Sequence, residues 1–99
     1  MKKYTIRYNP EALSDLADSF EWGVQNWGNE AARKWYNQIE TVIERRLSAL
    51  PASCPLAPES NDFETEVRQL LHGRYRVLFA IKDDVVRVLY IRGPYSRKS

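Results

Sequence analysis

The stretch that decides the fold runs from Val67 to Arg92 and reads VRQLLHGRYRVLFAIKDDVVRVLYIR. Its side chains alternate with a period of two, which is typical of strands with one buried face. Two pairs of turn-forming residues, His72-Gly73 and Asp83-Asp84, interrupt the alternation. The stretch therefore predicts a three-stranded antiparallel meander, with strands over residues 67–71, 74–82 and 85–92.

Two-residue turns fix which residues of neighbouring strands lie opposite each other. The predicted cross-strand pairs are Leu70–Tyr75, Arg68–Val77, Ile81–Val86, Val77–Tyr90 and Tyr75–Arg92. Because successive side chains of a strand point to opposite faces, the pairs divide the meander into two faces. The first is predicted to be a core face with two arginines at its end: Leu70, Tyr75, Val77, Phe79, Ile81, Val86, Val88, Tyr90, Arg68 and Arg92.

The second face mixes basic and apolar side chains. Its apolar members are Val67, Leu71, Leu78, Ala80, Leu89 and Ile91. Such a face is too apolar to be exposed to solvent alone and too charged to be buried in the core, so we expect it to contact a partner. The residues predicted to bind that partner or an anionic group are Gln69, Arg74, Arg76, Lys82, Arg87 and Arg92.

The first half of the chain predicts one strand followed by two helices. Residues 3–8 alternate like a strand, and Asn9-Pro10 predicts an N-cap with proline at the first helical position. Gly28 is predicted to end the first helix, Asn29 to cap the second, and Pro51 to stop it. The apolar stripes are Leu13, Leu16, Ala17, Phe20, Val24 and Trp27, then Ala32, Trp35, Tyr36, Ile39, Val42, Ile43, Leu47 and Leu50.

Together these segments predict an α+β fold in a single domain over residues 1–99. The expected order is an N-terminal strand, a two-helix hairpin of about 40 residues, a proline-bearing loop over residues 51–65, and the meander. We expect a four-stranded antiparallel sheet with the hairpin packed on one face.

Charge is distributed unevenly along the chain, although the formal net charge is only +2. Residues 51–66 hold four acidic side chains and no basic one, whereas residues 67–99 hold eight basic and two acidic side chains. The basic last third indicates an anionic partner. A solvated basic surface is the alternative interpretation.

Composition excludes several classes of protein. A hydrophobic content of 43% is too high for a disordered chain. No apolar run approaches the roughly 20 residues of a membrane-spanning helix, and the N-terminus lacks the apolar segment of a signal peptide. Cys54 stands alone, which excludes an internal disulfide and a cysteine metal cluster. We therefore expect a cytoplasmic protein with no metal, no cofactor and no membrane partner.

The order of elements and the motif Gly73-Arg74-Tyr75-Arg76-Val77-Leu78-Phe79 resemble the RelE/ParE toxin superfamily. The likeness is strongest from Val67 to Arg92, and Leu13, Leu16 and Trp27-Gly28 extend it loosely into the hairpin. The resemblance implies a growth-inhibiting toxin of a type II toxin–antitoxin module, held inactive by a cognate antitoxin. RelE-like members cut mRNA in the ribosomal A site, whereas ParE-like members bind and block DNA gyrase.

Metal-independent RNA cleavage needs groups that move protons and cations that hold the phosphate. The resemblance places Arg76 and Arg97 at two arginine positions of RelE-like nucleases. Their two first-strand lysines fall on Val67 and Gln69, which cannot move a proton, and Tyr95 precedes Arg97 where those enzymes have a later tyrosine. If the protein is a nuclease, its catalytic candidates are Arg76, Arg97, His72 and Tyr95.

Several of these residues also have a structural interpretation. His72 can be a solvated turn residue, and Tyr75 can be part of the core. Arg68 and Arg92 can form structural ion pairs with Glu64, Glu66 or Asp18.

The missing lysines, the missing terminal tyrosine and the long hairpin favour a ParE-like gyrase inhibitor. The alternatives are a ribosome-dependent mRNA endoribonuclease and a non-toxic binding module of the same fold. The expected partners are the antitoxin and either DNA gyrase or the ribosome with its mRNA.

Overall fold

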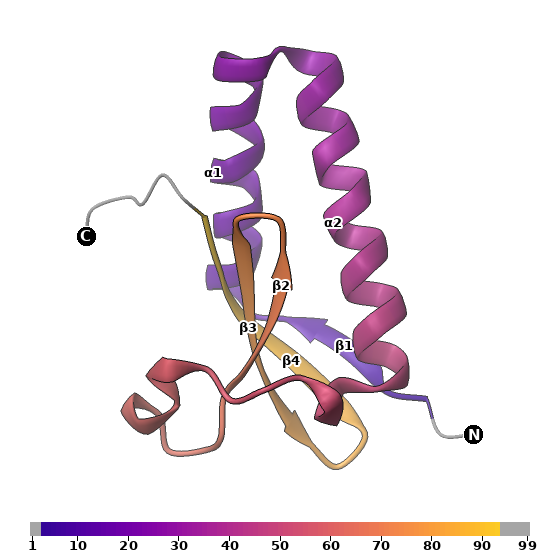
Figure 1. Cartoon of the computed structure of the whole chain (residues 1–99), viewed down its shortest axis with the longest axis vertical. Helices are drawn as coiled ribbons and strands as arrows, with labels where there is room; N and C mark the ends of the chain where they lie inside the picture. Colours follow the sequence, from indigo (N-terminus) through magenta and orange to yellow (C-terminus); the bar gives the residue numbers. More distant parts are fainter. Residues whose placement is uncertain (1–2, 94–99) are drawn as a thin grey trace.

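A computed structural model describes residues 3–93, and it contains a helical hairpin packed on a four-stranded sheet (Figure 1). The predicted order of elements is confirmed. The strands and helices are β1 (Thr5–Tyr8), α1 (Pro10–Trp27), α2 (Asn29–Ala49), the 3₁₀ turns η1 (Pro51–Ser53) and η2 (Pro58–Asp62), β2 (Arg68–His72), β3 (Tyr75–Lys82) and β4 (Val85–Arg92).

The sheet has the order β1-β4-β3-β2 and contains both parallel and antiparallel strand pairs. Strands β2, β3 and β4 form the predicted antiparallel meander, but β1 runs parallel to β4. The expectation of a fully antiparallel sheet was therefore wrong. Alternation in a four-residue strand shows which face is buried but carries no information on strand direction. The chain sets that direction by returning along α2 before it enters the meander at the far edge.

The first turn of the meander lies one residue later than predicted. Gly73 and Arg74 form it, and Gly73 takes a positive φ of 61° that favours glycine. Leu70 therefore lies opposite Val77, and Arg68 opposite Phe79, which corrects both predicted pairs. Because the register moves by two residues, the side chains of β2 keep their predicted faces.

The second turn is confirmed, but a bulge changes the end of β4. Ile81 pairs with Val86 as predicted, and Asp83 has a φ of 57°. Leu89 then has no residue opposite it, because Phe79 pairs with Val88 and Leu78 with Tyr90. The predicted pairs Val77–Tyr90 and Tyr75–Arg92 are replaced by Val77–Ile91 and Arg76–Arg92. The bulge moves Ile91 into the core and places Tyr90 and Arg92 on the opposite face, which corrects all three assignments.

The core lies between the sheet and the helical hairpin, and in Figure 1 β3 passes in front of α1 while β2 is seen between α1 and α2. On α1 the buried face consists of small residues and one leucine: Ala12, Leu16, Ser19 and Gly23. The predicted stripe of α1 was wrong at Leu13, Ala17 and Trp27, which are exposed. The predicted stripe of α2 was wrong at Leu50, which follows the helix and is 63% exposed. Gly23 allows the Trp27 ring to fold back, since a Cβ there would lie 3.0 Å from that ring.

Candidate functional site

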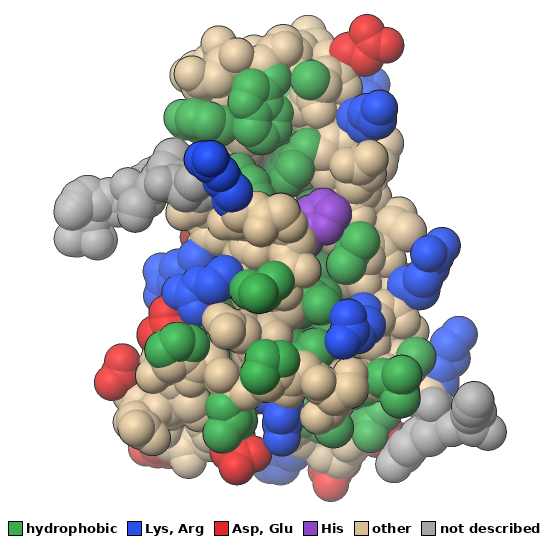
Figure 2. Space-filling view, viewed as in Figure 1, with side chains coloured by type: hydrophobic (Ala, Val, Ile, Leu, Met, Phe, Trp, Pro, Cys, Tyr) green, Lys and Arg blue, Asp and Glu red, His purple; other side chains and the backbone are tan. Residues whose placement is uncertain are grey.

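The sheet face away from the helices, here called the outer face, carries most of the residues predicted to bind a partner. In Figure 2, basic side chains lie beside hydrophobic ones over the half of the molecule that contains the strands. Its described side chains come from all four strands: Thr5, Arg7, Gln69, Leu71, Arg76, Leu78, Ala80, Lys82, Val85, Arg87, Leu89, Tyr90 and Arg92.

Residues 55–66, here called the covering loop, pack over part of the outer face. The Ala57 amide donates to the Val67 carbonyl at 2.8 Å, and the Gln69 amide donates to the Pro55 carbonyl at 3.0 Å. Ala57, Val67 and Leu78 form a second small core, joined by Phe63, Leu89 and Tyr90. Val67 and Leu78 are therefore fully buried, which corrects the expectation that they belong to a surface open to a partner.

Arg76 lies on the outer face near the start of β3, and its side chain is bound by the covering loop. Its Nη1 and Nη2 donate to the two carboxylate oxygens of Glu59 at 3.1 and 2.5 Å. Nη1 also donates to the Gln69 amide oxygen at 2.8 Å. Both charged side chains remain about 30% exposed, with values of 31% and 29%. The planar guanidinium thus holds one internal carboxylate in a bidentate contact.

The pair changes the acidity of both groups. Hydrogen bonding to Arg76 lowers the pKa of Glu59 below its ordinary value of 4.5, against an opposing effect of burial. The same hydrogen bonds raise the pKa of Arg76 above its ordinary value. Both groups are therefore charged at neutral pH.

Arg92 joins this site because of the bulge. It lies opposite Arg76 in the β3–β4 register, and its guanidinium carbon lies 4.7 Å from the centre of the Tyr90 ring. Its charge also contributes to the lowered pKa of Glu59. We call Glu59, Gln69, Arg76, Tyr90 and Arg92 the Arg76 cluster.

The remaining predicted basic residues lie apart from this cluster. Lys82 and Arg87 are exposed near the turn between β3 and β4, and both line a groove of about 720 Å³. Arg87 Nη1 donates to the Asn9 side-chain oxygen at 3.2 Å. Asn9 precedes α1 as predicted, but its side chain makes no capping hydrogen bond. Arg74 is exposed in the Gly73-Arg74 turn.

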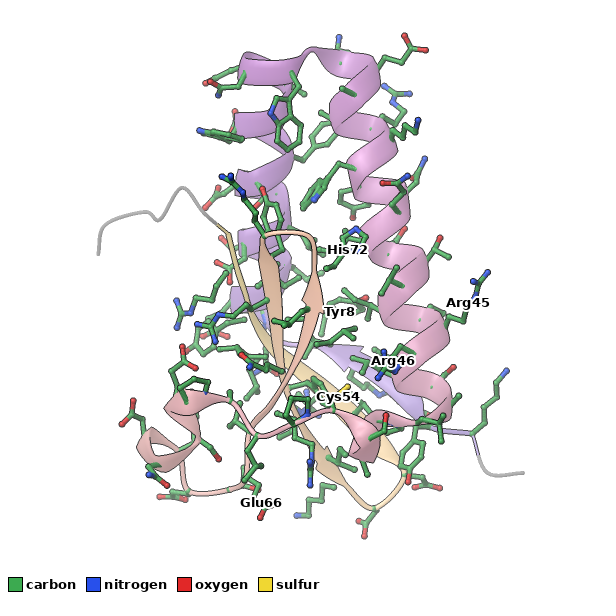
Figure 3. The ribbon with its side chains drawn as sticks, in the orientation of Figure 1. Tyr8, Arg45, Arg46, Cys54, Glu66 and His72 are labelled. Atoms are coloured by element: carbon green, nitrogen blue, oxygen red, sulfur yellow. The ribbon has the colours of Figure 1, made fainter. Side chains whose placement is uncertain are left out.

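His72 does not join Arg76. It is the last residue of β2 and lines a shallow groove of about 510 Å³ with residues of α2, including Lys34, Gln38 and Thr41. Figure 3 shows its side chain between the end of β2 and α2. Since Arg76 points to the outer face, the two side chains lie on opposite sides of the sheet. Tyr95 and Arg97 lie outside the described residues.

Two further titratable groups are poor candidates for chemistry. Burial raises the pKa of the Cys54 thiol, although Arg46 and Arg68 oppose this effect. Burial and the charges of Glu40 and Glu44 raise the pKa of Tyr8 to about 12. Both side chains are therefore protonated at neutral pH.

Among residues 3–93, no group of three histidine, cysteine or acidic side chains is placed to hold a metal ion. No helix in the same part of the chain is long and apolar enough to cross a membrane. One predicted structural ion pair is present, because Arg68 lies 3.7 Å from Glu66.

Sequence reasoning missed Glu59 and Arg7 as members of the outer face. The signal for Glu59 was the group of acidic residues within residues 51–66, because a carboxylate next to a basic sheet face can form an ion pair with one of its basic side chains. The signal for Arg7 was its place in the alternation of residues 3–8, opposite the apolar Ile6 and Tyr8.

Comparison with known proteins identifies the family. A family profile described as ParE toxin of type II toxin–antitoxin system, parDE, matches residues 6–93. The fold is similar to a chain of the chromosomal ParDE toxin–antitoxin system from P. aeruginosa, with a TM-score of 0.77, 19% identity, and coverage of 92% of this chain and 96% of that one. It is also similar to a chain of the RelBE2 toxin–antitoxin complex from Mycobacterium tuberculosis, with a TM-score of 0.67, 21% identity, and coverage of 94% and 93%. No curated protein sequence matches the chain. Since the profile spans nearly the whole described chain, this protein belongs to the ParE toxin family of type II toxin–antitoxin systems.

Proposed function

We propose that this toxin arrests growth by binding and inhibiting DNA gyrase, and that a cognate antitoxin neutralises it. Membership of the ParE toxin family supports a ParE-like target. The observation that carries the proposal is the set of hydrogen bonds that Arg76 donates to Glu59 and Gln69. This arrangement is suited to binding an anionic group of a partner but poorly suited to proton transfer.

Cleavage of RNA by this face would need a general base and a general acid close to Arg76. Gln69 does not titrate, and Val67 is buried in the small core under the covering loop. Glu59 is a carboxylate, but its lowered pKa makes it a weak base for a ribose hydroxyl. His72 lies on the other side of the sheet.

An antitoxin partner is supported by the two similar structures, one from a ParDE toxin–antitoxin system and one from a RelBE2 toxin–antitoxin complex. A segment that is disordered alone and folds on binding would suit the mixture of basic and apolar side chains on the outer face. Such an antitoxin would carry acidic and apolar residues.

The test begins with growth. The protein expressed alone is expected to stop cell growth, and co-expression of the small protein encoded beside it is expected to restore growth. Purified protein is then added in parallel to a gyrase supercoiling assay and to translating ribosomes.

We expect supercoiling to fall while the mRNA remains intact. Cuts in the mRNA at the ribosomal A site, with normal supercoiling, would overturn the proposal in favour of the nuclease. Normal growth of cells with confirmed expression would indicate a binding module without toxicity.

A further inference from the structure

We propose that the part of the outer face around Arg7 and Arg87 is a docking site for a short extended peptide that carries a carboxylate next to an apolar side chain. We call this part the Arg87 site. The carboxylate binds the two guanidinium groups, and the apolar side chain enters the adjacent groove. The antitoxin is the proposed source of the peptide, and in this respect the inference rests on the proposed function.

Arg7 and Arg87 lie opposite each other on the neighbouring parallel strands β1 and β4. Neighbouring strands are about 4.8 Å apart, so both side chains leave the same face close together. Like charges in this arrangement destabilise a sheet. Among residues 3–93, no carboxylate forms an ion pair with either guanidinium, since the pairs present join Arg68 to Glu66 and Arg76 to Glu59.

The second in-register arginine pair of the outer face shows what a compensated pair looks like. Arg76 and Arg92 also lie opposite each other, and there the chain supplies Glu59 as the counter-charge. Arg87 instead donates to the neutral side-chain oxygen of Asn9. The uncompensated pair therefore indicates an anionic group that comes from another molecule.

The groove beside Arg87 determines the second half of the ligand. It has a volume of about 720 Å³ and runs between Phe63 of the covering loop, the end of β3 and the first half of β4. Ala80 and Leu89 supply apolar surface from the sheet, and Lys82 adds a further positive charge. A volume of this size holds one or more side chains of a ligand.

The charges of the groove favour a peptide over a nucleic acid. Glu64 and Asp83 also line it. A phosphate backbone along the groove would pass these two carboxylates and would leave the apolar surface of Phe63 and Leu89 without a partner. A peptide can present its carboxylate to the arginines and its apolar side chain to the groove, because its residues alternate.

The test measures binding of a short fluorescein-labelled peptide of alternating leucine and glutamate residues to the purified full chain. The comparison probes are the same peptide with glutamine in place of glutamate and a single-stranded oligonucleotide of similar net charge. The variants are Arg7→Ala, Arg87→Ala and the double variant. Arg45→Ala is the matched control, because it removes one exposed charge from α2 (Figure 3).

We expect each single variant to weaken binding of the glutamate peptide about fivefold, and the double variant to weaken it more. The glutamine peptide is expected to bind weakly to all forms, and Arg45→Ala to bind like the parent. Affinity for the glutamate peptide should fall as salt rises. Thermal unfolding of each variant, followed by circular dichroism, establishes that it is folded.

Equal binding by the parent and a folded double variant would overturn the inference. So would an equal loss in Arg45→Ala, which would indicate attraction by net charge alone. Tighter binding of the oligonucleotide that is lost in the double variant would assign the site to nucleic acid. These readouts do not depend on toxicity, so normal gyrase activity together with specific peptide binding would reject the proposed function and support this site.

Discussion

The Arg76 cluster and the Arg87 site lie on the same sheet face and contain the same feature, two arginines opposite each other on neighbouring strands. In the Arg76 cluster the chain itself supplies the counter-charge through Glu59. In the Arg87 site no described carboxylate does so. The difference arises from the covering loop, which places the Glu59 carboxylate on Arg76 but forms no ion pair with Arg7 or Arg87.

The covering loop is held firmly enough to place Glu59. The Ala57 amide donates to the Val67 carbonyl, and the Val67 amide donates to the Ser60 hydroxyl at 2.9 Å. Ala57 also packs on Val67 and Leu78. A short segment with two hydrogen bonds to Val67, just before β2, and an apolar contact can hold a charged side chain in one position at a small cost in entropy.

The largest effect is expected from Leu78→Ala, which tests whether the small core holds the loop. Leu78 is fully buried, so truncation should lower the free energy of unfolding by about 2–4 kcal/mol. Urea denaturation measures this, and hydrogen exchange of the Ala57 and Val67 amides should become faster. Leu71→Ala is the control, since Leu71 is 60% exposed on the same sheet face. Unchanged exchange in a destabilised Leu78→Ala would show that the hydrogen bonds alone fix the loop.

The next effect is expected from Arg76→Ala, which leaves Glu59 without its bidentate partner. The expected loss is about 1–2 kcal/mol, since hydrogen bonds to charged groups are strong but both side chains are partly exposed. Adding Glu59→Gln to Arg76→Ala should recover part of the loss, because the unpaired carboxylate is removed. Urea denaturation of the two single variants and the double variant measures the coupling. Strictly additive losses would contradict a direct interaction.

A smaller effect is expected from pH. The pKa of Glu59 is lowered in the folded protein, so its interaction stabilises the fold above the pKa of an unfolded glutamate. That stability is lost as the pH falls from 4.5 through the lower folded pKa. The difference in unfolding free energy between the parent and Glu59→Gln should therefore shrink as the pH falls below 4.5. Glu66→Gln is the control, and its difference should stay near zero because Glu66 is 71% exposed and 3.7 Å from Arg68.

The sequence was sufficient to predict the order of elements and most of the core face. Alternation and turn residues report the local conformation and the buried face, and these decide where Val77, Phe79 and Val88 lie. Alternation cannot report a bulge, because one extra residue reverses every side chain that follows it. For this reason Tyr90, Ile91 and Arg92 were assigned to the wrong faces.

The candidate site was predicted less completely than the fold, because contacts of the covering loop decide it. The position of Arg76 on the outer face follows from its strand. Its partner Glu59 is 17 residues away in a loop whose path no periodicity reports. The separation of His72 from Arg76 follows from strand alternation once the turn is placed at Gly73-Arg74. Arg76 then lies opposite Leu71, and His72, the next residue of β2, points to the other face.

The smallest effect, and the sharpest contrast between the two halves of the face, is expected from Arg7→Ala. Removing one arginine of an uncompensated pair relieves repulsion, so the free energy of unfolding should rise by about 0.3 kcal/mol at low salt. The gain should disappear at high salt, because exposed charges are screened there. Arg76→Ala should show the opposite sign, since it breaks an ion pair. Urea denaturation at two salt concentrations measures both variants, with Arg45→Ala as the control for loss of an exposed charge. A loss of stability in Arg7→Ala that shrinks with salt would mean that the chain does neutralise this pair, and the two halves of the face would then be equivalent.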